Sequence, residues 1–264
     1  MEFMVCIKQV PDSMTIDINP ETGSLIRESA GAKINPYDLS AIEAALQVRE
    51  KTGGNIHALT MGPKQARFAI REALALEIDN GWIVTDKSFA GSDVLATAYT
   101  LSQAILNITE PDIIFCGKQS TDGDTAQVGP EIAELLGIPH ASYVTEINHV
   151  DKDYIIVTCN MGTYKEVLRL STPCLVCIEM EAYTPRISSL RNKISSQNKA
   201  INELSIGNLK DKDKDNYGYK GSPTKVRKIY VPKVKRESKI IDGDVDKIID
   251  ELIEKLNEWG CLNE

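Results

Sequence analysis

The chain has 264 residues, of which 42% are hydrophobic and 26% are charged, and its formal net charge is −8 at pH 7. This composition is that of an ordinary globular protein and excludes disorder along the whole chain, while the negative charge argues against general nucleic-acid binding, which requires a basic surface. No apolar run approaches the roughly 20 residues that cross a bilayer, and the N-terminus lacks the features of a signal peptide, so we expect a cytoplasmic protein without membrane insertion.

Short apolar runs alternate with helical patterns over the first two-thirds of the chain. This alternation predicts an α/β fold with a mainly parallel sheet and helices on both faces. The predicted strands are near-continuous apolar stretches, as expected when both faces of a sheet are covered: Phe3 to Val10, Asn55 to Met61, Trp82 to Thr85 and Asp112 to Cys116. Apolar residues at helical spacing predict helices over Ala41 to Val48, Ala66 to Leu76, Asp93 to Leu106 and Glu131 to Leu136.

The stretch from Ala141 to Ile178 changes to a period of two, which is typical of strands joined by tight turns. Its apolar runs are Tyr154 to Val157, Glu166 to Leu170 and Leu175 to Ile178. We therefore expect a β-rich edge that extends the sheet.

The last third of the chain has a different character. After Pro185 the pattern is lost among polar residues, and from Lys210 to Asp215 lysine alternates with aspartate. Such a run cannot bury enough apolar surface to fold on its own, and it indicates a solvated linker without a site. From Gly243 onward the spacing predicts an amphipathic helix, with apolar residues at Val245, Ile248, Ile249, Leu252, Ile253, Leu256 and Trp259. The sequence thus predicts an α/β body followed by an extended arm that ends in a helix.

The most informative stretch is the polar segment from Gly117 to Gly129, which follows the fourth predicted strand. It lies at the carboxyl end of the sheet, where open α/β folds bind ligands, and exposes N–H groups at the positive end of a helix, where phosphate is favoured. The spacing of Asp124 and Gln127 fits a helix capping box equally well. Because carboxylates repel phosphate, Asp122 and Asp124 are better explained as acceptors for ribose or amide hydrogens, or as groups that order the loop.

Three other segments end at the same predicted edge. Asn35-Pro36-Tyr37-Asp38 is a turn that leads into the first helix, and Asn-Pro starts turns by default. Met61-Gly62-Pro63 is a strand end at which glycine lets another group approach the backbone. Together with Cys6 to Asp12, these segments would line one crevice.

The cysteines and histidines give no sign of a metal site or of side-chain catalysis. Most of the six cysteines lie in apolar runs, so no disulfide framework is expected. Cys174 and Cys177 are three apart in a predicted strand, point to opposite faces and are expected to be buried. The three histidines are dispersed, and no serine or cysteine is paired with a base.

The sequence resembles the beta subunit of electron-transferring flavoproteins over essentially its whole length. The resemblance rests on Val5 to Asp12, Asn35 to Asp38, Met61 to Pro63 and, most specifically, the loop from Gly117 to Gly129. It implies an adenine-nucleotide-binding α/β fold, similar to adenine nucleotide alpha hydrolases, that pairs with the N-terminal domain of an alpha subunit. It also implies a division into an FAD- or nucleotide-binding domain (1–185), a partner-recognition loop region (186–206) and an arm with a helix that wraps the alpha subunit (207–264).

Carried over position by position, the resemblance implies which residues hold the nucleotide: Cys6, Asn35, Pro36, Tyr37, Asp38, Met61, Gly117, Lys118, Gln119, Ser120, Thr121, Asp122, Gly123, Asp124, Thr125, Ala126, Gln127 and Val128. It also implies that Leu190 anchors a partner dehydrogenase. An apolar side chain among polar neighbours suits such a role.

The loop sequence bears on the class of flavoprotein. Members that hold AMP as a structural ligand tend to have Asp-x-Asn-Gln-Thr-Gly, whereas Asp124 to Pro130 is Asp-Thr-Ala-Gln-Val-Gly-Pro, similar to the electron-bifurcating class, whose beta subunit holds FAD. That class implies NADH as the electron donor, and ferredoxin and a flavin-dependent dehydrogenase, of the acyl-CoA or 2-hydroxy-acid type, as acceptors. In such proteins the flavin carries the redox chemistry and no catalytic side chain is needed.

Two alternatives stay open at this point. The first is a single-FAD carrier with structural AMP in this subunit. The second is a stand-alone adenine-nucleotide-binding regulatory protein that forms homodimers. The apolar stripe of the terminal helix argues against the second, because a self-contained protein has no use for it.

Overall fold

The computed structural model describes residues 1–12, 17–18, 25–26, 31–227, 238 and 240–262. The chain divides into two compact units, Met1–Lys225 and Val226–Glu264. Each unit is described by itself below.

The first unit is built on a nine-stranded sheet in the order β11-β10-β9-β12-β8-β1-β6-β7-β13. Every neighbouring pair from β9 to β13 is parallel, and β10 runs antiparallel to both β9 and β11. The strands are β1 (Glu2–Cys6), β6 (Asn55–Met61), β7 (Asn80–Val84), β8 (Ile113–Gly117), β9 (His140–Val150), β10 (Tyr154–Asn160), β11 (Lys165–Ser171), β12 (Cys174–Ile178) and β13 (Ile201–Leu204).

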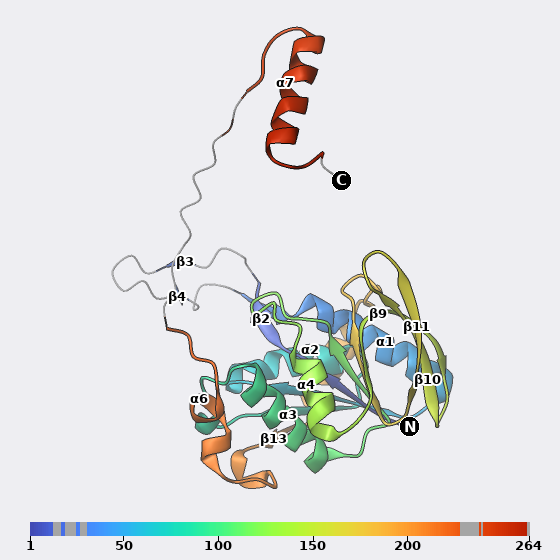
Figure 1. Ribbon diagram of the computed structural model, residues 1–264. Coiled ribbons are helices and arrows are strands. Elements are labelled where there is room, and N and C mark those ends of the chain that lie inside the picture. The colour runs from blue at the N-terminus through green and yellow to red at the C-terminus, as the bar shows by residue number, and fades with distance from the viewer. Residues whose placement is uncertain (13–16, 19–24, 27–30, 228–237, 239, 263–264) are drawn as a thin grey trace. The chain divides into compact units, whose positions relative to one another are not determined.

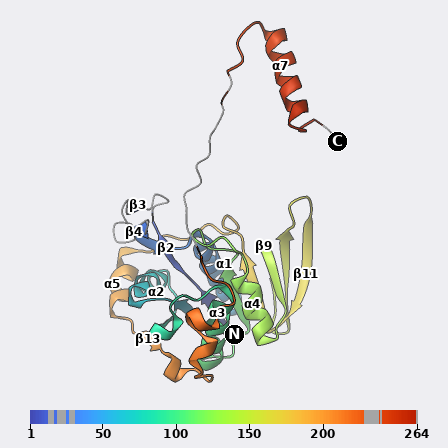
Figure 2. The ribbon, with the colours of Figure 1, turned by 60° about the vertical axis from the view of Figure 1, so that its left-hand side comes forward.

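Helices cover both faces of this sheet (Figures 1 and 2). One apolar cluster joins α1 and α2 to one face, and a second joins α3 and α4 to the other face. The helices of the first unit are α1 (Pro36–Thr52), α2 (Arg67–Ala75), α3 (Val94–Ile108), α4 (Val128–Leu136), α5 (Leu190–Asn198) and α6 (Gly218–Gly221), with 3-10 helices at Lys64–Ala66, Lys87–Phe89, Ile206–Asn208 and Lys214–Asn216. The predicted fold class, α/β with a mainly parallel sheet and a β-rich edge, is confirmed.

The strand order creates a switch point beside β1. The chain passes from β1 to β6 and β7 on one side and then crosses to β8 on the other side. In open α/β sheets, ligands bind at the carboxyl ends of the strands beside such a reversal.

One predicted strand is wrong in its extent. Phe3 to Val10 was expected to form a single strand, but β1 ends at Cys6, and β2 (Gln9–Pro11) pairs with β5 (Ala32–Ile34) in a separate two-stranded sheet. The backbone N–H of Lys8 donates to Asp38 Oδ2 at 2.7 Å instead of to a strand. A side chain thus takes over the ladder bond and turns the chain out of the main sheet. A further two-stranded sheet pairs β3 (Asp17–Ile18) with β4 (Leu25–Ile26).

The run from Lys210 to Asp215 also differs from the sequence prediction of a solvated linker. It lies between Leu209 and Tyr217, which are each 1% exposed. The ring of Tyr217 lies 5.4 Å from the rings of both Phe89 and Tyr99. These apolar residues hold the run against the body, and the first compact unit ends at Lys225. Earlier in the chain, β13 adds a parallel strand to the edge of the sheet.

The second unit contains α7 (Val245–Glu258), as the apolar spacing predicts. Asp244 caps it, because its side chain accepts from the N–H of Lys247 at 3.0 Å. None of the residues of α7 is buried. Among the described residues, no helix is both long and apolar enough to cross a membrane.

Candidate functional site

A cleft of about 1360 Å³ lies at the carboxyl ends of β1, β6, β7 and β8. It therefore occupies the switch point of the sheet. Its wall on one side is the loop between β8 and α4, and on the other side the segments that follow β6 and β7.

The floor of the cleft is organised by Asn35 and Asp38, at the start of α1. Asn35 is 1% exposed and Asp38 is 5% exposed. The Asn35 side-chain amide donates to Asp38 Oδ1 at 2.9 Å and to the carbonyl of Gln119 at 2.8 Å, and its oxygen accepts from the N–H of Thr121 at 3.3 Å. These two side chains are thus engaged with the protein, and they fix β1 and the loop after β8 to the same helix.

The protonation of Asp38 reflects this position. Burial raises its pKa from 3.8 to about 7, against the hydrogen bonds from Lys8 N–H, the Asn35 side chain and Gly117 N–H, which favour the charged form. Its three donors all come from the protein, so Asp38 is a structural hub that joins β1, α1 and the end of β8.

Glycines let the loop approach its neighbours. A Cβ on Gly117 would lie 2.3 Å from Asp38 Oδ1 and 2.7 Å from Tyr37 Cβ. A Cβ on Gly129 would lie 2.4 Å from Cys177 Sγ. Side chains at these two positions would push the loop off the sheet, so glycine here sets the position of α4 and of the cleft wall.

The loop also presents unpaired backbone donors. Asp124 and Ala126 have left-handed backbone angles, with φ of 55° and 56°. Such angles are costly for non-glycine residues and concentrate where a loop is held in a functional shape. Within the described part of the chain, the N–H groups of residues 125–129 have no hydrogen-bond acceptor. They lie at and before the first turn of α4, where the helix dipole favours an anion.

The two loop aspartates order the loop. Asp122 Oδ1 accepts from Lys8 Nζ at 2.6 Å, and Asp124 Oδ1 accepts from the Gln119 amide. The alternative prediction of a capping box between Asp124 and Gln127 is wrong, since the cap residue Gln127 makes no side-chain cap bond. The left-handed turn at Asp124 directs that carboxylate back to Gln119.

Most of the predicted nucleotide-binding residues line this one cleft: Cys6, Asn35, Asp38, Met61, Gly117, Lys118, Gln119, Ser120, Gly123, Thr125, Ala126, Gln127 and Val128. Pro36, Tyr37, Thr121, Asp122 and Asp124 are not among the lining residues. Nucleotide binding by these five residues, and by the lining residues, remains a prediction.

Sequence reasoning missed the wall that follows β7. Residues 85–94, Thr97, Leu101, Glu203 and Lys214 also line the cleft. The signal for residues 85–94 was present, because they follow a predicted strand that ends at the same sheet edge as Met61. Lys214 had no such signal: it lies in the charge run interpreted as a linker without a site, and its charge lowers the pKa of Asp86, after the larger effect of the Ser88 N–H.

Three thiols stand side by side under the cleft. Cys6 on β1, Cys116 on β8 and Cys177 on β12 are in register on adjacent strands. A hydrogen bond to Cys6, followed by burial, raises the pKa of Cys116 well above its ordinary value. Cys174 and Cys177 are buried in opposite apolar clusters, as their spacing predicts.

Away from the cleft, apolar side chains are exposed around α5. Leu190 is 74% exposed and Ile194 is 61% exposed, and both line a shallow hollow of about 560 Å³ with Arg191, Ser195 and Asn198. Ile187, just before the helix, is 94% exposed. The segment predicted to dock a partner is therefore at the surface.

Known proteins resemble this chain over nearly its full length. The sequence profile of the electron transfer flavoprotein domain matches residues 22–208. The electron transfer flavoprotein subunit beta of Thermoanaerobacterium thermosaccharolyticum is 41% identical over 257 residues, which cover 97% of this chain and 98% of the relative. The acryloyl-CoA reductase electron transfer subunit gamma of Anaerotignum propionicum is 40% identical over 263 residues, with 97% and 98% covered. Protein FixA of Sinorhizobium fredii is 39% identical over 265 residues, with 97% and 92% covered.

Proposed function

The chain belongs to the electron transfer flavoprotein family, as a subunit of the beta type, and on this premise we propose that it holds an FAD in the cleft and acts in flavin-based electron bifurcation. The proposal rests on the loop of residues 117–129. Within it, residues 125–129 line the cleft at the switch point of the sheet, and their N–H groups have no acceptor in the described part of the chain. When bound, FAD would take a hydride from NADH and pass electrons to ferredoxin and to the flavin of an alpha subunit.

The residues present fit a flavin nucleotide. The N–H groups of residues 125–129 supply donors for phosphate oxygens without a cationic side chain. Gly117 and Gly129 let the loop lie close to the sheet and leave the cleft open. The Asp122 carboxylate is paired with the Lys8 cation, which lessens its repulsion of a phosphate, and the Asp124 carboxylate is bound by the Gln119 amide.

The size of the cleft favours FAD over AMP. Its volume of about 1360 Å³ exceeds the roughly 300–1,000 Å³ of pockets that enclose drug-sized ligands. The wall of residues 85–94 offers additional surface beyond the loop. The second candidate is a single-FAD carrier with AMP in this cleft. It is supported by the similarity to a protein named only as electron transfer flavoprotein subunit beta.

The partners follow from the same premise. We expect an alpha subunit, to which the unit Val226–Glu264 binds through the exposed apolar residues of α7. We expect the residues around Leu190 to dock a flavin-dependent dehydrogenase. The relative named as an acryloyl-CoA reductase subunit favours an acyl-CoA substrate for that dehydrogenase over a 2-hydroxy acid.

The deciding experiment counts nucleotides. The chain is co-expressed with its alpha subunit, and the complex is denatured in acid and analysed by absorbance and chromatography. Two FAD and no AMP per heterodimer are expected, with reduction of both flavins by NADH. One FAD and one AMP would assign the chain to the single-flavin class.

A variant locates the second flavin. Thr125→Glu places a carboxylate beside the phosphate position, and two like charges roughly 4 Å apart repel by about 4 kcal/mol at an effective dielectric constant of about 20. Loss of one FAD per heterodimer is expected. Thr125→Ser keeps a hydroxyl and serves as the matched control. Retention of both flavins in Thr125→Glu would contradict the site.

A further inference from the structure

Helix α5 is attached to the body in an unusual way for a short helix. Its only buried residue is Ser196, and its two aliphatic side chains, Leu190 and Ile194, are exposed. Isolated helices of this length are not stable in water, and most helices are held by an apolar face. Something other than apolar packing must therefore hold α5 in place.

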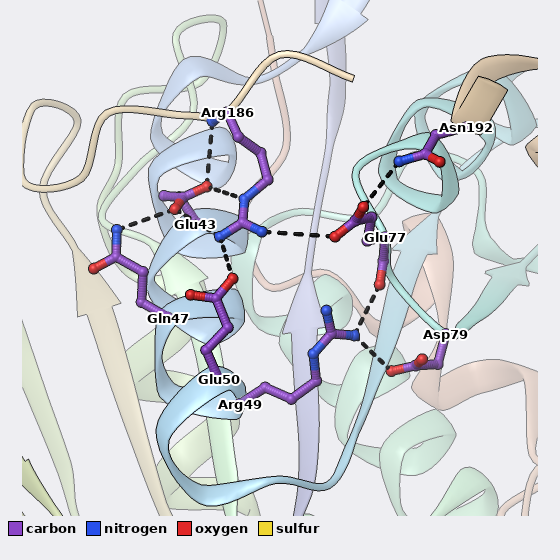
Figure 3. A network of polar contacts seen from close by, with 8 residues as sticks. All are labelled: Glu43, Gln47, Arg49, Glu50, Glu77, Asp79, Arg186 and Asn192. Atoms are coloured by element: carbon purple, nitrogen blue, oxygen red, sulfur yellow. Dashed lines mark hydrogen bonds and ion pairs between the residues drawn. The ribbon is translucent and has the colours of Figure 1, made fainter. Parts of the chain in front are cut away.

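The N-terminal attachment is an arginine clamp centred on Arg186 (Figure 3). Its guanidinium binds Glu43 through two hydrogen bonds, Nε to Oε2 at 2.8 Å and a terminal nitrogen to Oε1 at 3.0 Å. The same group reaches Glu50 at 2.8 Å and Glu77 at 3.7 Å. The backbone N–H of Arg186 also donates to Glu43, at 3.2 Å. We call Arg186, Glu43, Glu50 and Glu77 the clamp.

The clamp extends directly into α5. Glu77 Oε1 accepts from the side-chain amide of Asn192 at 2.9 Å, so one carboxylate joins the clamp to the first turn of the helix (Figure 3). Glu77 has a left-handed backbone with φ of 75°, and its carbonyl accepts from Arg49 at 2.8 Å. A strained residue held from two sides has a fixed orientation.

The C-terminal end of α5 is fastened by polar contacts too. Arg71 on α2 donates to the carbonyl of Lys199 at 2.7 Å and to that of Ser196. Lys199 Nζ donates to the carbonyl of Ile78 at 2.9 Å. Both ends of the helix are thus held by hydrogen bonds and ion pairs, and the aliphatic side chains between them remain uncovered in the described part of the chain.

We propose that Arg186 is a positioning residue: through the clamp it fixes the segment of residues 187–198 with Ile187, Leu190 and Ile194 outward, as the docking surface for the redox partner. This inference rests on the proposed function. Glu43, with a side chain 7% exposed, gains little net stability from an ion pair compared with apolar packing. What the two-pronged contact supplies is a fixed geometry.

The chemistry of the surface indicates its occupant. The helix carries Arg191 and Lys193 and no acidic residue, within a chain of net charge −8. Exposed aliphatic side chains flanked by cations fit an apolar pocket with an acidic rim on another protein. The structure therefore favours a dehydrogenase with such a pocket over an anionic small ligand, for which the aliphatic side chains would have no use.

The same helix that carries the clamp also carries the floor of the cleft. Asp38 lies in the first turn of α1, Ser40 accepts from the N–H of Tyr183 at 3.1 Å, and Glu43 follows one turn later. Helix α1 therefore fixes both the position of the docking surface and the position of the cleft floor.

The test uses the complex with its alpha subunit and titrates two probes, an acyl-CoA dehydrogenase and a 2-hydroxy-acid dehydrogenase of the flavin-dependent class. Arg186→Gln alone would leave Glu43 buried without a cation and could unfold the region, so the principal variant is the charge-neutral pair Glu43→Gln with Arg186→Gln. Arg186→Lys is the conservative variant, and Arg169→Gln is the control, because Arg169 lies on the edge strand β11 and stacks on Tyr154.

Several readouts are expected to move together. In the neutral pair, trypsin should cleave faster after Arg191 and Lys193, and KM for the accepted dehydrogenase should rise about tenfold. Flavin content and kcat at saturating partner should stay within twofold of the native complex. The KM of Arg186→Lys should lie between that of the native complex and that of the neutral pair. Adding Leu190→Ala to the neutral pair should cost little more, because residues that act as a unit are not additive.

Other outcomes overturn the proposal and can be told apart. Unchanged cleavage and KM in the neutral pair would show that Arg186 positions nothing. The neutral pair could show faster cleavage and an unchanged KM while Leu190→Ala alone raises KM. That result would support docking through Leu190 and would show that Arg186 plays no part in it. No effect of Leu190→Ala in any background would overturn the docking surface itself, and with it this part of the proposed function.

Discussion

The cleft loop and the docking segment are held by different physics. Residues 117–129 depend on close approach: a Cβ on Gly117 or Gly129 would lie within 2.4 Å of a neighbouring side chain. Residues 186–198 depend on charge: Arg186 and its three carboxylates hold the segment while its aliphatic side chains stay exposed.

The two kinds of attachment predict different responses to change. The close contacts at Gly117 and Gly129 leave no room for an added methyl group. The clamp accepts added volume, but it depends on salt, on pH and on both partners of each ion pair.

Gly117→Ala should abolish nucleotide retention. Overpacking of a well-packed site typically costs about 1–3 kcal/mol, and the methyl group would meet the Asp38 carboxylate and Tyr37. Nucleotide content of the purified complex measures the effect. Gly207→Ala is the control, since its Cβ would lie 3.6 Å from the nearest atom. Full nucleotide content in Gly117→Ala would show that the loop does not depend on this close approach.

Asp38 should make the stability of the complex depend on pH. Burial raises its pKa from 3.8 to about 7, so between these values the folded chain holds a proton that the unfolded chain has released. Stability from this group is therefore present at low pH and is lost as the pH rises through about 7, by up to about 1.4 kcal/mol per pH unit.

Asp38→Asn removes this titration. The unfolding free energy of the native complex, relative to that of the variant, should fall as the pH rises from 4 to 7, measured by urea unfolding at fixed protein concentration. Asp153→Asn, which changes an exposed carboxylate, is the matched control. A relative stability that does not change with pH for Asp38→Asn would place the pKa of Asp38 outside this window.

Leu190→Ala should slow electron delivery to the dehydrogenase and leave flavin content unchanged. Truncating an anchor at the centre of an interface commonly costs 2 kcal/mol or more, so a rise in KM of about tenfold or above is expected in steady-state kinetics. Val167→Ala removes a similarly exposed aliphatic group, 65% exposed, from the edge strand β11 and should have no effect. Equal kinetics for the two variants would exclude a docking role for Leu190.

Added salt should change amide exchange differently in the two regions, with a smaller effect than the substitutions above. Exposed ion pairs contribute about 0–1 kcal/mol and weaken as ionic strength rises. Amide hydrogen exchange in residues 186–198 should therefore accelerate modestly between low and high salt. Exchange in residues 132–136 of α4, a helix that Gly129 seats against the sheet and that has no ion pair in the described part of the chain, should stay constant. The same acceleration in both regions would remove the distinction drawn here.

Elements that form from local sequence could be predicted. The strand Asn55–Met61 and the helix Val94–Ile108 form as expected, because a continuous apolar run and apolar residues at helical spacing act locally. The alternating run from Lys210 to Asp215 was misjudged because tertiary contacts hold it. It lies between buried Leu209 and Tyr217, and the ring of Tyr217 packs on Phe89 and Tyr99, more than a hundred positions earlier.

The candidate site shows the same limit. Strand ends that meet at one sheet edge could be predicted, and so could the loop after β8. The clamp could not, because no spacing in the sequence relates Arg186 to Glu43. Nor could the hydrogen bonds by which Asn35 and Asp38 tie β1 to the loop after β8, because no sequence spacing places Lys8 and Gln119 beside them.

The in-register thiols give the cleft a chemical probe of its own occupancy. Cys6 and Cys116 line it and are 8% and 5% exposed, so a ligand seated there covers both. The raised pKa of Cys116 makes that thiol slow to react even when the cleft is empty. Slower alkylation in the presence of ligand, with exposed Cys261 as the internal reference, therefore reports how fully the cleft is filled, without a spectroscopic signal from the ligand itself.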